Sequence, residues 1–326
     1  MVAVLIVAVI VNVMLGTVKM SVSEVLSVIF GGSGDDVSRS VIMSIRLPRI
    51  VSAIILGGAL ALSGYMLQTF FDNPIVGPFV LGISSGAKLT VALFLIFFMA
   101  RGHKPTSFSI VAAAFIGAMI AMSFVLLISV RVRSMGILVV CGIMTGYICS
   151  AVTDLVVTFA DDSNIVNLHN WSMGSLSGMS GADVRIMTVV VAICVIAAFV
   201  MSKPIGAFRL GEAYARSAGV NVMLLRVMLI LVSSLLAAVV TAFAGPISFV
   251  GIAVPHLVKS LTKSTAPLVM IPGCFLLGAI VTLTCDGIAR TLFAPTEVSI
   301  SSVTAVLLVP VVIFVMLKRR RENFTV

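Results

Sequence analysis

Long apolar segments recur from one end of this chain to the other, and they constrain its fold more than any other feature. Each is close to the ~20 apolar residues that an α-helix needs to cross the hydrocarbon core of a bilayer. The composition agrees, because 60% of the residues are hydrophobic and 10% are charged, whereas a soluble domain is about half apolar and about a quarter charged. We therefore predict an all-α polytopic membrane protein with about ten transmembrane helices. The predicted spans are about residues 2–18, 49–70, 80–100, 107–130, 135–158, 184–202, 223–243, 247–263, 267–289 and 301–317.

Local breaks set the boundaries of these spans. Gly245–Pro246 interrupts an apolar run and separates the seventh span from the eighth. A similar Gly77–Pro78 pair follows the second span, and the two pairs are compatible with an inverted internal repeat, as many transporters have. Ser23–Phe30 is short and amphipathic, so we expect it at the membrane surface. The run that begins at Val2 lacks a basic segment before it and a clear cleavage site, which favours a spanning helix over a signal peptide. Because no long linker divides the chain, we predict a single transmembrane domain over residues 1–326.

The distribution of basic residues predicts the side that each loop faces. An even number of spans places both termini on the same side of the membrane. With both ends inside, 12 Lys and Arg residues lie on the inner side and 8 lie outside, which follows the positive-inside tendency. The run Lys318–Arg321 is the strongest single indication. We therefore expect both termini in the cytoplasm and membrane lipid around the bundle.

The sequence contains no familiar catalytic motif. It has no Gly-x4-Gly-Lys-Ser/Thr loop for binding ATP, no HExxH, no paired catalytic carboxylates and no nucleophile beside a base. The five cysteines lie in or beside apolar runs, so we interpret them as small buried hydrophobic residues rather than metal ligands. The net charge of +9 is explained by basic residues at the inner membrane edge. We therefore predict no enzyme activity, no metal, no cofactor bound by this chain and no nucleic-acid partner.

One short polar island, Leu210–Val220, stands between long apolar runs. We predict a cytoplasmic helix near residues 208–220. A capped, rigid helix can transmit a rigid-body push from another protein, so the island is a candidate for coupling to a separate motor. The alternative is an ordinary amphipathic surface helix. The candidate coupling residues are Leu210, Gly211, Glu212, Ala213, Tyr214, Ala215, Arg216, Ser217 and Gly219.

Local signals within the island agree with a helix. Four residues share one helical face by their spacing, namely Leu210, Ala213, Tyr214 and Ser217. Glu212 and Arg216 form an i,i+4 pair on another face. Gly219 is placed to end the helix as a C-cap.

A second group of motifs surrounds the predicted second span. Arg46-Leu-Pro-Arg49 precedes the span, and Asp72-Asn-Pro-Ile-Val-Gly-Pro follows it. Pro74 and Pro78 prevent a continuous helix there. The Ser-Ser-Gly at residues 84–86 can begin the next helix. Taken alone, these residues indicate only a packing helix followed by a turn.

Together with segments downstream, these motifs resemble the permease subunits of the iron-siderophore, haem and vitamin B12 ABC importers, the FecCD-like family. The downstream segments are Trp171-Ser-Met-Gly-Ser175, Leu210–Val220, Gly245–His256, Asp286-Gly-Ile-Ala-Arg290 and Glu297. The resemblance runs in unbroken order from about residue 20 to the end. It implies a fold similar to that of the vitamin B12 importer permease (type II ABC importer), in a prokaryotic plasma (inner) membrane.

The resemblance also implies partners and roles. It implies a homodimer with a translocation path along the two-fold axis, two cytoplasmic ATPase subunits that use ATP and Mg, and an extracytoplasmic substrate-binding protein. The positions matching the docking surface for the binding protein are Arg46, Arg49, Arg290 and Glu297. The alternatives are headgroup anchoring for Arg46 and Arg49, and i−4 pairing with Asp286 for Arg290. The remaining structural or pathway candidates are Gln68, Asn73, Pro74, Gly82, Ser84, Ser85, Gly86, Gly245, Pro246, Gly251, Pro255 and His256.

We therefore expect a membrane-spanning permease subunit of an ABC importer that translocates a metal chelate. Iron-siderophore is the default cargo because it is the commonest in the family, with haem and cobalamin as alternatives. A self-sufficient secondary transporter is the main rival, but the sparse intramembrane charges supply little for a coupling-ion site. An intramembrane enzyme is the third class, and it lacks catalytic groups.

Overall fold

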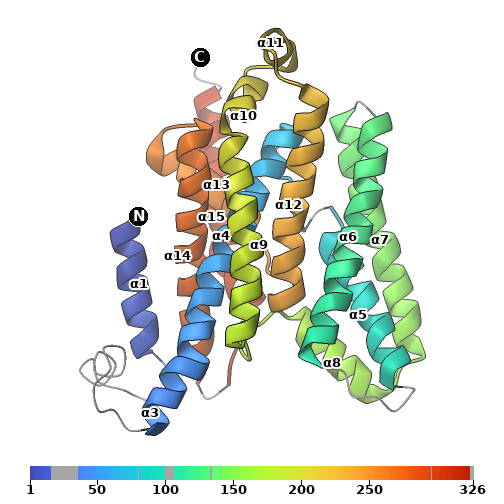
Figure 1. The fold of residues 1–326 in the computed structure, drawn as a ribbon, viewed down its shortest axis with the longest axis vertical. Coiled ribbons are helices and arrows are strands. Elements are labelled where there is room, and N and C mark those ends of the chain that lie inside the picture. Colours follow the sequence, from blue (N-terminus) through green and yellow to red (C-terminus); the bar gives the residue numbers. More distant parts are fainter. Residues whose placement is uncertain (16–35, 80, 100–105, 133, 295, 324–326) are drawn as a thin grey trace.

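The computed structural model describes residues 1–15, 36–79, 81–99, 106–132, 134–294 and 296–323, and within these ranges the chain is helical without strands (Figure 1). The helices are α1 (Val2–Met14), α3 (Asp36–Val41), the π-helical turn η1 (Ile42–Arg46), α4 (Leu47–Phe71), α5 (Ile83–Met99), α6 (Ser107–Arg131), α7 (Met135–Thr158), α8 (Asp162–Ser172), α9 (Gly181–Val200), α10 (Ser202–Arg209), α11 (Glu212–Ser217), α12 (Val222–Ala244), α13 (Val250–Thr262), α14 (Pro267–Thr291) and α15 (Ile300–Asn323).

The helices confirm the predicted spans. Among the described residues, six helices are long and apolar enough to cross a membrane: Arg39–Phe71, Ser107–Ser129, Met135–Thr158, Gly181–Val200, Val222–Ala244 and Pro267–Thr291. Four more are apolar but shorter: Val2–Met14, Ile83–Phe98, Val250–Thr262 and Ile300–Phe314. Each predicted span overlaps one of these ten helices. The amphipathic segment predicted at Ser23–Phe30 lies outside the described residues.

The helix that contains the second span begins earlier than predicted. It runs from Asp36 through η1 to Phe71, whereas the prediction began at residue 49. Pro48 lies two residues after the end of η1, and its ring nitrogen cannot donate a helical hydrogen bond. A π-helical turn is a common way to absorb such a local defect without ending a helix. The expectation that Arg46 and Arg49 lie in a loop before this span is therefore wrong.

Helix α4 is the centre of the bundle, with α9, α12, α13 and α14 packed against it. Its glycines allow the closest approaches. Gly57 contacts α14 at Gly278, and Gly64 contacts α13 at Gly251, so closely that a Cβ at either position would overlap the neighbouring backbone. Gly57 and Gly64 therefore let α4 pack closely against its neighbours, as small residues do in membranes.

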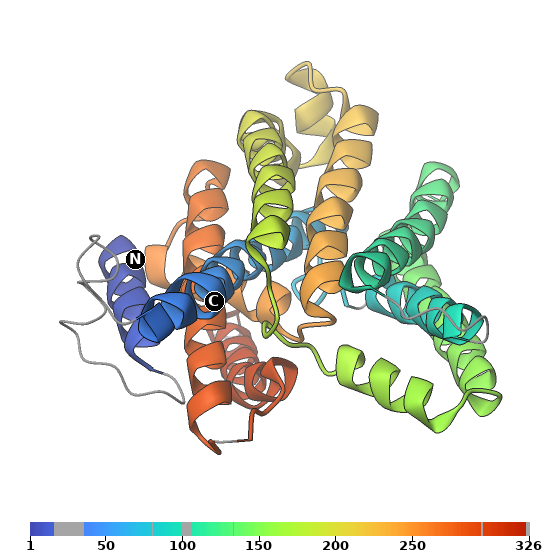
Figure 2. The same cartoon turned by 60° about the horizontal axis from the view of Figure 1, so that its bottom comes forward.

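The packing is reciprocal between the two halves of the chain. Helices α4 and α12 run in opposite directions (Figure 1). α4, from the first half, packs against α13 and α14 of the second half. In the same way α12, from the second half, packs against α5 and α6 of the first half. Figure 2 shows α5, α6, α7 and α8 gathered on one side of the central helices. This exchange of contacts is the arrangement expected of an inverted repeat.

Candidate functional site

The predicted island forms a short helix that projects beyond the ends of its neighbours (Figure 1). Glycines bound α11 on both sides. Gly211 has φ 122° and ψ 147°, a conformation that is essentially restricted to glycine. Gly219 has φ 81°, and the N–H groups of Gly219 and Val220 donate to the carbonyls of Arg216 (3.1 Å) and Ala215 (2.9 Å). These two bonds form a Schellman motif, which ends the helix sharply.

Ion pairs and one buried contact hold α11 in place. Glu212 accepts hydrogen bonds from Arg216 at 2.6 Å and from Arg226 of α12 at 2.7 Å. The first pair was predicted from its i,i+4 spacing, whereas the second joins residues 14 apart and was missed. Ala215 is fully buried beneath the helix. The island is therefore attached to α12 rather than loosely suspended.

The opposite face of α11 is exposed. Leu210 is 71% exposed and Tyr214 is 54% exposed, and Ala213 and Ser217 are exposed with them. These four residues were predicted to share one helical face, but Leu210 lies at the end of α10 and Gly211 separates it from α11. A short helix that presents Tyr214 outward, with Leu210 exposed just before it, is suited to a protein partner, because aromatic anchors are common at the centres of interfaces.

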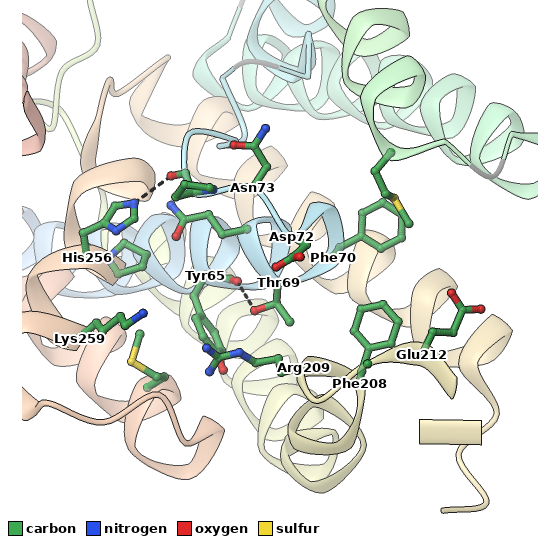
Figure 3. A pocket seen from close by; sticks show the side chains of 16 residues that line it. Tyr65, Thr69, Phe70, Asp72, Asn73, Phe208, Arg209, Glu212, His256 and Lys259 are labelled. Carbon is green, nitrogen blue, oxygen red and sulfur yellow. Dashed lines mark hydrogen bonds between the residues drawn. The ribbon is translucent and has the colours of Figure 1, made fainter. Parts of the chain in front are cut away.

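A polar pocket of about 450 Å³ lies below α10 and α11 (Figure 3). It is lined by Tyr65, Gln68, Thr69, Phe70, Asp72, Asn73, Pro74, Met135, Phe208, Arg209, Gly211, Glu212, Pro255, His256, Lys259 and Met270. The structure thus brings together five of the predicted pathway candidates: Gln68, Asn73, Pro74, Pro255 and His256. His256 Nε2 lies 2.9 Å from the carbonyl oxygen of Pro74, and Gln68 Nε2 donates to the carbonyl of Ile252 at 3.2 Å.

The other pathway candidates lie elsewhere, in close backbone contacts. Gly82, with φ 77°, packs against Gly146 of α7. Gly86 packs against Gly117 of α6, and Ser84 is buried beside it in α5. Ser85 accepts a hydrogen bond from Ser150 at 3.4 Å. A role for these residues in translocation stays a prediction.

The Gly245–Pro246 turn has its own contacts. Gly245, with φ 70°, lies against the carbonyl of Trp171 and against Gly174, and Pro246 accepts a hydrogen bond from Ser301 of α15. The turn therefore connects the segment after α8 to the beginning of α15. Gly251 is the second residue of α13 and packs on α4, as described above.

At the end of the bundle away from α11, three arginines form a buried ionic cluster. Arg49 pairs with Asp286 at 3.0 Å and with Glu297 at 3.0 Å. Arg290 lies 3.2 Å from Asp286 and donates to Asn12 Oδ1 at 2.8 Å. Arg46 donates to the carbonyl of Val13 at 2.6 Å. The cluster thereby joins α1, α4 and α14 to the loop before α15.

This cluster corrects the predicted placement of the arginines. Arg46, Arg49 and Arg290 are only 4%, 7% and 8% exposed, so they are not available as surface charges in this structure. Both Arg46 and Arg49 are buried here, and contact of either side chain with headgroups or with a binding protein stays a prediction. The alternative of an i−4 pair between Arg290 and Asp286 is confirmed. Glu297, at 42% side-chain exposure, is the accessible member, and docking of a partner there stays a prediction.

A bundle of ten apolar helices with one capped helix projecting from its end is the architecture of a multi-pass membrane permease. The model of the FecCD transport family matches residues 4–318, and the chain therefore belongs to this family. The vitamin B12 import system permease protein BtuC of Salmonella typhi is 34% identical over 284 residues, which cover 86% of this chain and 84% of the relative. BtuC of Salmonella newport (strain SL254) matches to the same extent.

Solved structures agree with this family membership. An inward-facing metal-chelate type ABC transporter has a TM-score of 0.86 and 27% identity, covering 97% of both chains. PsaBC from Streptococcus pneumoniae, in complex with Fab, has a TM-score of 0.56 at 17% identity and covers 82% of this chain and 90% of its own, which supports the fold alone. The protein is thus a non-catalytic permease of the ABC importer type. The fold and family inferred from the sequence motifs are confirmed.

Proposed function

We propose that this protein is the membrane subunit of an importer for a metal chelate, driven by ATPase subunits that bind at α11. The observation that carries the proposal is the outward face of α11, where Tyr214 is exposed on a helix bounded by glycines and attached to α12, with Leu210 exposed at the end of α10 just before it. A helix held in this way moves as a unit with α12. ATP and Mg belong to the ATPase subunits in this proposal, and not to the permease.

The rest of the proposed assembly is taken from what the family resemblance implies. We infer a homodimer in a prokaryotic plasma (inner) membrane, with α11 and both termini on the cytoplasmic side. A substrate-binding protein delivers the chelate at the other end, near Glu297. The direction of α15, which runs toward the α11 end of the bundle, supports a cytoplasmic C-terminus (Figure 1).

Iron-siderophore is the cargo expected from the family, and cobalamin is a second candidate because the BtuC relatives are named for vitamin B12 import. A strain that lacks the gene and is complemented with it distinguishes the two. Uptake of radiolabelled iron-siderophore without uptake of labelled cobalamin supports the first, and the reverse supports the second. Uptake of neither by a strain that also expresses the cognate ATPase and binding protein contradicts both.

The ATPase contact is tested with Tyr214→Ser. Loss of an aromatic anchor at the centre of an interface commonly weakens binding by tenfold or more. We expect the variant to insert and fold normally but to lose copurification with the ATPase. Tyr147→Ser is the matched control, because Tyr147 is 68% exposed on α7 and lies outside the island. If the Tyr214 variant retains the ATPase as well as the control does, α11 is not the coupling helix.

A further inference from the structure

Lys88 is a cationic residue inside one of the apolar helices of this chain. It lies in the second turn of α5 and is half-buried. Among the residues that the structure describes, none forms an ion pair or a hydrogen bond with its ammonium group. A charge within a membrane is costly, and such residues commonly mark the pathways of substrates or ions.

Contacts with α6 give the depth of Lys88 in the bundle. Two residues before it, Gly86 lies against the carbonyl of Gly117. Two residues after it, Thr90 donates to the carbonyl of Ala113 at 2.8 Å. Lys88 is therefore level with residue 115, midway between these two contacts on α6. At a rise of 1.5 Å per residue, this level is about 12 Å from the start of α6 and about 24 Å from its end.

The direction of α5 argues against an ammonium group that reaches the lipid headgroups. Side chains of an α-helix tilt toward its N-terminus. α5 begins inside the bundle, where Gly82 packs against Gly146 near the middle of α7, and runs toward the end away from α11 (Figure 1). Lys88 therefore tilts away from the nearer headgroups, and its four-carbon stem would have to cross about 12 Å to reach them.

The neighbours of Lys88 on its own helical face are buried. Ser84 and Ala92 lie one turn before and one turn after it, and they are 9% and 1% exposed. Further along the same face, Ala92 and Leu95 border a small hollow whose opposite wall includes α8. A lipid-facing stripe would instead be exposed at every turn. The exposed part of Lys88 therefore adjoins a gap between packed elements of the protein.

Asp154 of α7 is an acidic residue at a similar level. Ser85 of α5 accepts a hydrogen bond from Ser150 of α7 at 3.4 Å. This pair and the contact of Gly82 show that the two helices run parallel, so Lys88 and Asp154 follow at about the same height. The side chain of Asp154 is nevertheless exposed, and it forms no ion pair with Lys88. No direct counter-ion for Lys88 is thus present at this level among the described residues.

We propose that Lys88 lies on the translocation route and favours metal chelates with net negative charge over neutral or cationic ones. Carboxylate or phenolate oxygens of such a chelate would accept charge-assisted hydrogen bonds from the ammonium group. The attraction is stronger there than in bulk water, because the surroundings have a lower dielectric constant. The nature of the cargo rests on the importer function proposed above, whereas the local preference for anions does not.

The first measurement uses the full-length permease in nanodiscs, without ATPase or cargo. Ser85→Cys places a thiol one turn from Lys88. This thiol is treated with an anionic reagent, sulfonatoethyl methanethiosulfonate, or with a cationic one, trimethylammonioethyl methanethiosulfonate. Peptide mass spectrometry locates the label, so the native cysteines stay in place, and the buried Cys274 is the unlabelled reference. We expect Lys88→Gln to lower the anionic-to-cationic ratio of labelling rates at least tenfold, which is about 1.4 kcal/mol.

Two further variants show whether the effect comes from charge at this position. Lys88→Arg should keep the ratio, because it keeps the positive charge. Lys263→Gln is the matched control, because it removes one positive charge at the exposed C-cap of α13. A purely structural role of Lys88 would change both labelling rates together and leave their ratio unchanged. The proposal is overturned by an unchanged ratio in Lys88→Gln, or by a thiol at position 85 that reacts with neither reagent.

The second measurement tests the cargo with the complete importer. It compares uptake of ferric citrate, an anionic chelate, with uptake of ferrioxamine B, a cationic one. Lys88→Gln should lower the ratio of ferric citrate to ferrioxamine B uptake at least tenfold, and Lys88→Arg should preserve it. Equal losses for both chelates, or uptake of ferrioxamine B alone by the unmodified importer, would overturn the preference. Uptake of neither chelate would contradict the proposed iron cargo, while the labelling ratio still decides the role of Lys88.

Discussion

Arg49 and Asp286 are 237 residues apart in the sequence, yet they form a buried ion pair between α4 and α14. Nε of Arg49 donates to both carboxylate oxygens at 3.1 Å, and Nη2 donates to Oδ1 at 3.0 Å. Asp286 also lies 3.2 Å from Arg290, so one carboxylate faces two guanidinium groups. The ionic cluster is therefore part of how the two central helices are joined.

Asp286→Asn should destabilise the protein strongly. Removing one partner of a buried ion pair costs about 3–5 kcal/mol, and here Arg290 loses its paired carboxylate while Arg49 keeps Glu297. Glu297→Gln is the matched control. Its side chain is 42% exposed, and exposed pairs contribute about 1 kcal/mol or less. Denaturant unfolding in detergent micelles measures the free energy of unfolding of both variants. Equal losses of this free energy would contradict the assigned difference in burial.

Replacing Arg46 and Arg49 together by Glu should prevent folding. Exposed docking arginines would tolerate this reversal and only slow the association of a binding protein. In the observed arrangement the reversal places one buried carboxylate beside Asp286 and Glu297, where Arg290 must balance all three, and another against the carbonyl of Val13. Arg185→Glu is the control, because Arg185 is exposed near the start of α9 at the same end of the bundle. Size-exclusion chromatography after membrane extraction should show a monodisperse control and an aggregated or absent double variant.

Gly211→Ala should uncouple transport without preventing insertion. At φ 122° and ψ 147°, a residue with a Cβ costs on the order of 1–3 kcal/mol, so the start of α11 should shift. Gly211→Pro should abolish uptake, because proline fixes φ near −65°. Gly181→Ala is the control, since Gly181 lies in a helix with open space around it. Substrate-stimulated ATPase activity of the reconstituted complex is the measurement, and full activity in both Gly211 variants would refute coupling through α11.

Gly64→Ala should separate α4 from α13. A Cβ at Gly64 would overlap the carbonyl of Gly251, which is backbone and cannot rotate away. Overpacking of this kind costs about 1–3 kcal/mol. Gly136→Ala, near the start of α7, has its nearest neighbouring atom 4.0 Å away and should be neutral or slightly stabilising. Thermal unfolding compares the two, and a neutral Gly64→Ala would contradict the described packing.

Some features of this protein were predictable from the sequence because they depend on local or solvent physics. A helix that crosses a bilayer must be apolar along its length, so the apolar runs alone located the ten apolar helices. The helix in the island Leu210–Val220 was predictable because its signals are local. The i,i+4 pair and the C-cap glycine act between neighbours in the chain, and both are present in the structure. The family followed from the order of its motifs.

The arginine positions show what the sequence by itself left open. A charge near the end of a span can face water, reach headgroups or turn inward to a counter-ion, and the choice depends on which helix lies opposite. Arg49 turns inward because α14 brings Asp286 to it, and Glu212 binds Arg226 because α12 passes beside α11. The pocket around Tyr65 likewise depends on tertiary packing, since α4, α10, α13 and α14 each contribute part of its lining. Local propensity determined which segments are helices, and only tertiary packing decided which charged and polar groups those helices bring together.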